Sequence, residues 1–496
     1  MAVVRESGKH RQMRSSRLFP AVLVVALAAV MALSPVASAA KEVTIKGRGW
    51  GHGIGMSQYG AYGLAQEGWR AGQILRHYYS GVDVVERSIG QNIRVGMLQG
   101  HSSITISPRK KATDGGRLDL KVAGTQDKIV TAQPGDSLRL EASSTGGARI
   151  YKNGAQVRRE GRTVFGDLEH PVVAKYERYG TMVDTTGKDY AVAYGKIEFV
   201  SYRSSGCAAG KCLSQVAVLG MQKYLYGLGE VPSSWPLESL RSQAIAGRTY
   251  AFAKVLAGQK RVPCYCGVYD SVFDQVFIGE AKRTGSGSFW KAWKGAVDST
   301  HRKVILYDGS PITAMYSSSS GGHTESNSNV WGTAQVPYLQ GVKDPYDRAG
   351  GANPNFRWSV TMSWSTLRSK LAGSFGSFGK LKSLEIVRKG VSGRVAVEGL
   401  KIVGSTRTLR VDGWDVRTAL GLKDTWFRFK VVEPTTARKA PSKSSSASED
   451  TIIEAPQPEP GLSPPPSPSP ELSPSPEPSP SPDPTPSPAP SPSPSP

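Results

Sequence analysis

A single glutamate among apolar neighbours is the first residue in this sequence that could do chemistry. Glu230 lies in GLGEVPSSWP, with Leu228 before it and Val231 after it. Apolar surroundings remove solvation from a carboxyl group, so it holds its proton more tightly and its pKa rises. A carboxyl group that is still protonated near neutral pH can act as a general acid. The alternative is an ordinary solvated loop glutamate.

A serine-rich stretch supplies polar side chains that could hold a sugar. Residues 314–347 read AMYSSSSGGHTESNSNVWGTAQVPYLQGVKDPYD. Hydroxyl groups both donate and accept hydrogen bonds, as sugar hydroxyls require, and aromatic faces can stack on sugar rings. An ordinary serine-rich turn is the competing interpretation. The candidate binding residues of this stretch are Ser319, Ser320, His323, Glu325 and Tyr338.

A run of alternating glycines raises a different question. Residues 47–61 read GRGWGHGIGMSQYGA, with glycine at every second position from 47 to 55. An extended strand with this pattern would have one face of bare backbone, at a high entropic cost. That face could receive a ligand, or it could allow tight packing on a neighbouring segment. His52, Ser57 and Gln58 are its candidate binding residues.

Two helices are expected to position these groups. After Glu230, Pro236 suits a first helical position, Glu238 a first turn and Gly258 a helix end. That helix is apolar on two sides, so we expect it to be buried in the middle of its domain. Ser57 is predicted to cap a helix over QYGAYGLAQ.

The remaining pattern predicts an α+β fold. Residues 93–200 contain short alternating runs such as NIRVGML, SSITISP, RLDLKV, SLRLEA and KIEFVSY, which predict strands of a β-rich scaffold or insertion. We expect a mixed catalytic domain with a central buried helix and β-sheets. The predicted segments are a signal peptide (1–39), the glycine-rich cassette (40–92), the β-rich region (93–200), the catalytic core (201–432) and a disordered tail (433–496).

The two ends of the chain indicate export. A basic start, the apolar run LFPAVLVVALAAVMAL and ASAA predict a cleaved secretory signal, with an uncleaved anchor as the alternative. The tail, rich in proline and serine, has too few apolar side chains for a core and predicts extended disorder, as a stalk or as a solvated tail. We therefore expect a secreted protein of the cell wall.

The net charge and the absence of certain motifs limit the classes of partner and cofactor that we expect for this protein. The net charge of +22 falls to about +18 when the leader removes five cations and one glutamate. An exported protein this basic is expected to meet anionic cell-wall polymers, not nucleic acid. The sequence has no G-x-G-x-x-G, no nucleophile elbow and no H-E-x-x-H, so we expect no cofactor and no catalytic metal.

Three long motifs together resemble the stage II sporulation protein D family, which includes amidase enhancers. They are YLYGLGEVPSSWPLESLRSQAIAGRTYA, SSSSGGHTES with PYLQGVKDPYD, and GWGHGIGMSQYGAYGLAQEGW. The resemblance covers most of residues 44–430. It implies peptidoglycan remodelling by a lytic transglycosylase, with Glu230 at the catalytic position and Arg248 among the substrate-binding residues.

The implied chemistry needs only one carboxyl group. A glycoside hydrolase normally uses a second carboxylate to attack or to activate water. In a lytic transglycosylase, the 6-hydroxyl of the sugar closes on the anomeric carbon and leaves a 1,6-anhydro product. Glu230 would serve as acid and then as base on peptidoglycan glycan strands. The alternative is a non-catalytic wall-binding module that assists a separate amidase.

Four cysteines, Cys207, Cys212, Cys264 and Cys266, fit the exported setting. Export favours disulfides, for which three connectivities exist. Since some members of the family bind zinc, a four-thiolate zinc site is the competing interpretation.

The order of the motifs departs from the family. In typical members the GWGHGIGMSQYGA cassette comes last, directly after the segment resembling DTWFRF, whereas here it comes first. We interpret this as a circular permutation, which is tolerated when the original ends lie close together. Residues 44–49 and 427–431 are therefore predicted to be neighbours, as paired strands of one sheet.

Overall fold

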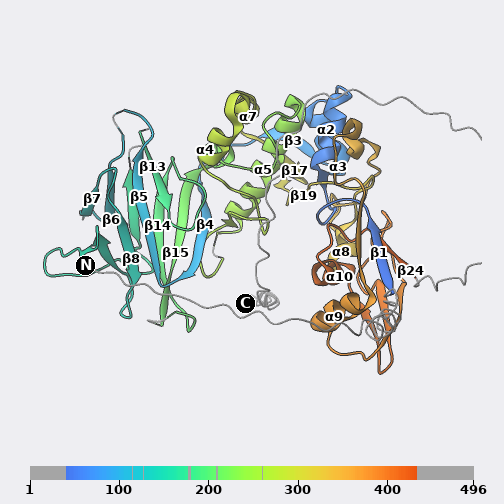
Figure 1. Ribbon diagram of the computed structural model, residues 1–496. Helices are drawn as coiled ribbons and strands as arrows, with labels where there is room; N and C mark the ends of the chain where they lie inside the picture. Colours follow the sequence, from blue (N-terminus) through green and yellow to red (C-terminus); the bar gives the residue numbers. More distant parts are fainter. Residues whose placement is uncertain are drawn as a thin grey trace, which may run out of the picture. The chain divides into compact units, whose positions relative to one another are not determined.

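The structure is a computed structural model that describes residues 41–432, except 114, 127, 177–179, 208–209 and 260 (Figure 1). The predicted signal peptide and proline-rich tail lie outside the described residues. Helices and several sheets alternate along the chain, so the predicted α+β fold is confirmed. Within the described part of the chain, no helix combines the length and apolar character needed to cross a membrane.

The predicted strand-rich region forms two larger sheets, and all five predicted runs are strands within them. The first sheet has the order β16 (Val268–Tyr269), β4 (Asn92–His101), β15 (Lys211–Gly220), β14 (Lys196–Arg203), β12 (Val172–Tyr176), β6 (Leu118–Val122) and β7 (Lys128–Ala132). The second has the order β10 (Ala155–Gln156), β9 (Ala148–Lys152), β8 (Leu138–Ala142), β5 (Ser103–Lys110) and β13 (Thr181–Thr185), with β11 (Val164–Phe165) on β9. Because β15 and β16 come after residue 200, the strand-rich region and the expected catalytic core share one sheet.

Helices cluster before and after Glu230. They are α2 (Gln58–Gln66), α3 (Ala71–Tyr78), α4 (Met221–Tyr226), α5 (Leu237–Leu256), α6 (Ala281–Ser286), α7 (Trp290–Ser299), α8 (Asn327–Trp331), α9 (Trp364–Phe375) and α10 (Gly413–Leu420), with 3₁₀ turns η1 (Gly287–Phe289) and η2 (Pro345–Gly351). The long helix α5 is buried along most of its length, as predicted, and packs against α2, α3, α4 and α7. Pro236 is its N-cap instead of its first residue, and Gly258 follows its C-cap with φ 93°.

Smaller sheets hold the remaining segments. Their orders are β18 (Ser310–Pro311), β17 (Lys303–Tyr307), β3 (Asp83–Glu86); β21 (Leu381–Ile386), β22 (Leu400–Gly404), β23 (Thr408–Val411); and the parallel pair β19 (Tyr316–Ser317), β2 (Met56–Ser57). A further sheet has the order β20 (Trp358–Ser363), β1 (Glu42–Gly47) and β24 (Phe427–Val432).

The predicted pairing of the two chain ends is confirmed. Strands β1 and β24 are antiparallel, with Glu42 opposite Val432 and Gly47 opposite Phe427. Figure 1 shows the blue β1 beside the orange-red β24. Val43 and Ile45 of β1 are buried in a core shared with α9, α10 and β22. The first and last described strands therefore close one small domain core.

The glycine run is not an extended strand, so that prediction is wrong. Gly49, Gly51, Gly53 and Gly55 all have positive φ, between 67° and 118°. Between β1 and β2, residues 48–55 take part only in two isolated bridges, Trp50 with Ser319 and Ile54 with Glu325.

The glycines make room for a buried ion pair. Any side chain at Gly53 would collide with the guanidinium group of Arg394. That group forms two hydrogen bonds with Asp424, Nε to Oδ1 at 2.8 Å and Nη2 to Oδ2 at 3.0 Å. Of the two explanations for the glycine run, the structure therefore supports tight packing.

Candidate active site

Glu230 lies directly before α5 and is half-buried. Its Oε1 accepts hydrogen bonds from the backbone N–H of Val276 at 2.7 Å and from the Tyr316 hydroxyl at 2.9 Å. Because both donors meet Oε1, the proton of the neutral acid is best placed on Oε2. A carboxyl group held in this way presents one oxygen as an acid.

Burial raises the pKa of Glu230 from 4.5 to about 7. The two hydrogen bonds, the amide of Gln58 and the charge of Lys282 oppose this rise. Lys282 is itself buried and donates to the Val231 carbonyl at 2.5 Å, and burial lowers its pKa to about 8. The pKa of Glu230 thus falls in the range where a carboxyl group can both give and take a proton near neutral pH.

A chain of hydrogen bonds fixes Tyr316 against Glu230. The Tyr316 hydroxyl accepts from Gln275 Nε2 at 2.8 Å, and Gln275 Oε1 accepts from the Tyr224 hydroxyl at 2.9 Å. Gln275 also reaches the carbonyl of Gly247 at 3.3 Å, where the helix has no side chain in the way. The absence of a side chain at Gly247 of α5 therefore allows this close approach.

The cassette reaches Glu230 through Gln58, the first residue of α2. Its Nε2 donates to the Glu230 carbonyl at 3.4 Å and to Gln243 Oε1 of α5 at 3.3 Å. Ser57 caps α2 as predicted, accepting from the Gly60 N–H at 3.1 Å. Residues far apart in sequence thus meet at the start of α5.

Two buried aspartates, Asp344 and Asp347, organise the serine-rich loop. Asp347 accepts from the hydroxyls of Ser57 at 2.6 Å and Ser319 at 2.7 Å, and Asp344 accepts from the Ser320 hydroxyl at 2.7 Å. Burial and the neighbouring Asp347 raise the pKa of Asp344 to about 8. Ser57, Ser319 and Ser320 are buried and bonded to protein, so this arrangement uses them to hold the loop.

The predicted ligand residue His52 is neutral at physiological pH. Its Nδ1 accepts from the Ile54 N–H at 2.9 Å, and its ring lies 5.6 Å from that of Trp331. Desolvation lowers its pKa to about 4, helped by the charges of Arg394 and Arg417. His52 can therefore take part in hydrogen bonding but not as a cation.

His323 and Glu325 are engaged within their own loop. His323 Nδ1 lies 2.6 Å from the Thr324 carbonyl, and no contact between described residues joins it to Glu230. Fully buried Glu325 accepts five hydrogen bonds, from Ser326 N, Asn329 Nδ2, Val391 N, Ser392 N and Ser392 Oγ. The candidate binding residue His323 is therefore not joined to Glu230 by any contact between described residues.

Arg248 and Tyr338 also bind protein groups. Arg248 is buried against the end of α7, donating to Val297 O at 3.2 Å and Lys303 O at 3.1 Å, and burial lowers its pKa to about 10. The Tyr338 hydroxyl accepts from the Thr313 N–H at 3.1 Å. Sugar binding by these residues stays a prediction.

The cysteines form two local disulfides, Cys207–Cys212 and Cys264–Cys266. The preference for disulfides over a zinc site is thus confirmed, and of the three connectivities the crossed ones do not occur. No cluster of three potential metal ligands occurs in the described part of the chain.

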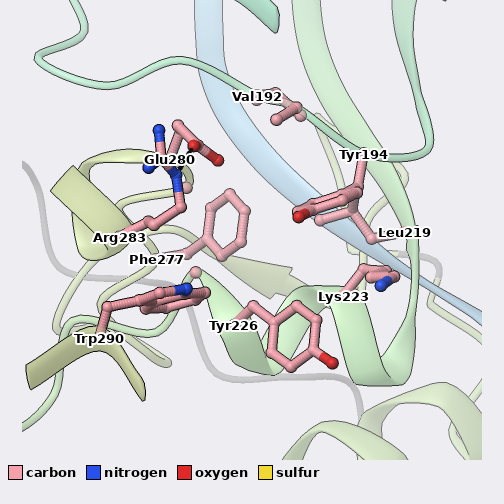
Figure 2. A pocket seen from close by; sticks show the side chains of 12 residues that line it. Val192, Tyr194, Leu219, Lys223, Tyr226, Phe277, Glu280, Arg283 and Trp290 are labelled. Carbon is pink, nitrogen blue, oxygen red and sulfur yellow. Dashed lines mark hydrogen bonds and ion pairs between the residues drawn. The ribbon is translucent and has the colours of Figure 1, made fainter. Parts of the chain in front are cut away.

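A small hollow lined by aromatic side chains lies beside α4, and it is too small for a sugar. Figure 2 shows Tyr194, Tyr226, Phe277 and Trp290 around it, with Lys223 at one side. Its volume is about 10 Å³, room for roughly one water molecule.

Exposed aromatic surface occurs instead beside Gln58. Trp235 contacts the ring of Tyr59 at 4.9 Å and that of Tyr62 at 5.2 Å. All three rings are partly exposed. They form an aromatic platform, and its member Trp235 lies five residues after Glu230 in the sequence.

Comparisons with known proteins find similarity over part of this chain. Residues 209–307 match the family described as Stage II sporulation protein. The amidase enhancer of Bacillus subtilis (strain 168) is 38% identical over 141 residues, 28% of this chain and 17% of that protein. Stage II sporulation protein D of the same organism is 29% identical over 219 residues, 42% of this chain and 60% of that protein. A protein of Brachyspira hyodysenteriae described as uncharacterized is 32% identical over 181 residues, 36% of this chain and 44% of that protein.

These matches define an α+β protein with a stage II sporulation protein domain that contains Glu230. Part of the chain is therefore similar to stage II sporulation proteins and to an amidase enhancer. The chain spans less than two thirds of the length of these three relatives.

Sequence reasoning missed several residues of the site. Tyr316 stands in the quoted serine-rich stretch, where its position directly before four serines was the available signal. Gln275, Val276 and Lys282 lie in segments with no distinctive pattern, and only their contacts reveal them.

Proposed function

We propose that this protein is a peptidoglycan lytic transglycosylase with Glu230 as its acid and base. The names of its relatives, stage II sporulation protein D and amidase enhancer, support a peptidoglycan-related function. The observation that carries the finer proposal is Glu230 itself: half-buried, with two donors on Oε1 and a pKa raised to about 7.

The reaction proceeds by two proton transfers. Glu230 gives its proton to the glycosidic oxygen as the bond from that oxygen to the anomeric carbon breaks, and the electron pair leaves with the oxygen. The carboxylate then takes the proton of the 6-hydroxyl while that oxygen bonds to the anomeric carbon. Glu230 ends protonated and ready for another cycle, and the product carries a 1,6-anhydro ring.

The surroundings of Glu230 serve both steps. The Val276 N–H and the Tyr316 hydroxyl stabilise the carboxylate formed after the first transfer. The platform of Tyr59, Tyr62 and Trp235 offers ring faces on which sugars can stack. Glu325 is enclosed by five hydrogen bonds, so it is not placed to activate a water molecule as a second carboxylate.

The decisive variant is Glu230→Gln, which keeps the acceptor oxygen but removes the acid. We expect this variant to release anhydro-muropeptides from purified sacculi roughly 10²–10⁴-fold more slowly. The released products are measured by mass spectrometry. Glu169→Gln, an exposed change of the same charge in the strand-rich region, should keep the wild-type rate. Wild-type release by folded Glu230→Gln would contradict the mechanism.

A second function is favoured by the relative named amidase enhancer. In this alternative the protein binds the wall and stimulates a separate amidase without cutting glycan. Its signature would be faster peptide release by an added amidase, undiminished in Glu230→Gln, with no anhydro product from the wild-type protein.

A further inference from the structure

A basic pocket lies on the face of α5 that points away from Glu230. It has a volume of about 630 Å³ and opens between the start of α3, the first turns of α5, and the junction of α7 with β17. The elements α3, α7 and β17 each contact α5 (Figure 1).

Helix geometry separates this pocket from the candidate active site. Glu238, Arg241 and Ile245 line the pocket and share one face of α5, at spacings of three and four residues. Gln243, which contacts Gln58 beside Glu230, is turned roughly 140° from Glu238 around the helix. The pocket and the glutamate are therefore on different sides of the same helix.

Glu238, the only carboxylate among the described residues that line the pocket, is already neutralised. Glu238 Oε1 binds Arg241 Nη1 at 2.5 Å, and Glu238 Oε2 accepts from the Ala71 N–H at 2.8 Å. Its charge is therefore used within the protein.

Three other cations of the pocket remain unpaired. Within the described part of the chain, Arg70, Arg76 and Lys303 form no ion pair, and Arg76 donates only to the Gly72 carbonyl at 3.3 Å. Glu86 is the cross-strand neighbour of Lys303 but lies beyond ion-pair distance. The pocket thus keeps a net positive charge.

The chemistry of the lining points to phosphate. Guanidinium groups match phosphate oxygens in pairs, and a pocket of this volume is in the usual range for ligand sites. No aromatic side chain is among the described residues that line the pocket, so these residues offer no stacking surface of the kind that bases of single-stranded nucleic acid need. Exposed Arg87 and Arg302, whose backbones are hydrogen-bonded to each other, continue the basic surface beyond β3 and β17.

We propose that this pocket binds a phosphodiester polymer of the cell wall, of the poly(glycerol phosphate) type. Binding here would hold the protein on the wall independently of glycan contacts at Glu230. The choice of a wall polymer rests on the proposed cell-wall function, whereas the pocket itself does not require glycan cleavage.

The test measures the affinity of the full exported protein for labelled poly(glycerol phosphate). Binding is monitored by fluorescence anisotropy at several salt concentrations. The double variant Arg70→Gln/Lys303→Gln should bind at least about tenfold more weakly and with a shallower salt dependence. Lys382→Gln/Arg410→Gln removes the same charge from the exposed sheet of β21 and β23 and should change the affinity less than about twofold. Melting curves confirm that each variant is folded.

Three outcomes would overturn the proposal: no binding by the wild-type protein, equal losses in the two double variants, or tighter binding of a single-stranded DNA of equal charge. Anhydro-product release by the wild-type protein is measured separately on sacculi stripped of anionic polymers. Its failure would contradict the proposed enzyme activity and leave the polymer-binding result standing.

Discussion

Individual acids of this protein differ in what their surroundings allow them to do. Glu230 has two donors on one oxygen and reaches solvent, so its proton can be exchanged with a ligand. Asp344, Asp347 and Glu325 are fully buried and bonded to serines, amides and backbone N–H groups. Of these four acids, only Glu230 combines a raised pKa with access to solvent, which favours a mechanism with a single acid.

The raised pKa of Glu230 has a consequence for stability. Glu230 binds its proton more tightly in the folded than in the unfolded chain, so its contribution to stability falls as pH rises from 4.5 to about 7. Glu230→Gln does not ionise and should be more stable than the wild-type protein above pH 7, by up to about 3 kcal/mol.

Denaturant unfolding of both proteins across this pH range gives the difference directly. Below pH 4.5 the two proteins should be similar, because Glu230 is protonated in both states. A difference that stays constant with pH would show that the pKa of Glu230 is not raised.

At the scale of elements, an N-cap residue can hold a neighbouring loop in place as well as stabilise its own helix. Ser57 caps α2 and also bonds Asp347 and the Ser320 N–H, so one hydroxyl joins the cassette to the serine-rich loop. Ser363 caps α9 by the same bond to the backbone, at 3.1 Å, but in an exposed setting. The two caps differ in what else depends on them.

Replacing each cap by alanine measures that difference. Ser363→Ala should cost about 1 kcal/mol, the usual value of a lost N-cap. Ser57→Ala also removes a hydrogen bond from a buried carboxylate, so we expect a loss of roughly 2–4 kcal/mol in the free energy of unfolding. Similar losses in the two variants would argue against the buried network.

At the scale of the whole molecule, the pairing of β1 with β24 joins the first and last described strands in one sheet. Strand β1 lies between β20 and β24 and buries Val43 and Ile45 in the core of this domain. This is the neighbourhood that a circular permutation requires of the original ends. The permutation itself stays a proposal, supported by this pairing.

A disulfide between the two strands tests their register. Lys46 lies opposite Arg428, and both side chains are exposed. Directly opposed residues of antiparallel strands have the Cα separation that a disulfide needs. Lys46→Cys/Arg428→Cys should therefore oxidise readily and stabilise the protein by ~2–4 kcal/mol.

The control is Lys46→Cys/Lys430→Cys, because Lys430 pairs with Thr44 and is diagonal to residue 46. The four native cysteines are all paired, so no native thiol competes. Mass analysis under non-reducing conditions should find the bond only in the first variant. Equal oxidation of both variants would contradict the register.

Features set by neighbouring residues were predictable from the sequence alone. The helix α5, the Ser57 cap, five strands of the β-rich region and the apolar surroundings of Glu230 all depend on patterns within a few residues. The pairing of β1 with β24 was also predicted, because the order of the motifs departs from that of the family.

Contacts between distant residues were decided only by the tertiary structure. The partners of Glu230 come from positions 46 and 86 residues away, Val276 and Tyr316, and no local pattern marks them. The glycine run was predicted as a strand because the alternation of glycine with other residues is a local signal. Its glycines from Gly49 to Gly55 instead have positive φ values, and Gly53 leaves room for Arg394 of the buried Arg394–Asp424 pair. Ser319 and Ser320, predicted to bind a sugar, donate hydrogen bonds to Asp347 and Asp344, because buried hydroxyls and carboxylates pair within the protein. Sugar binding by these serines stays a prediction.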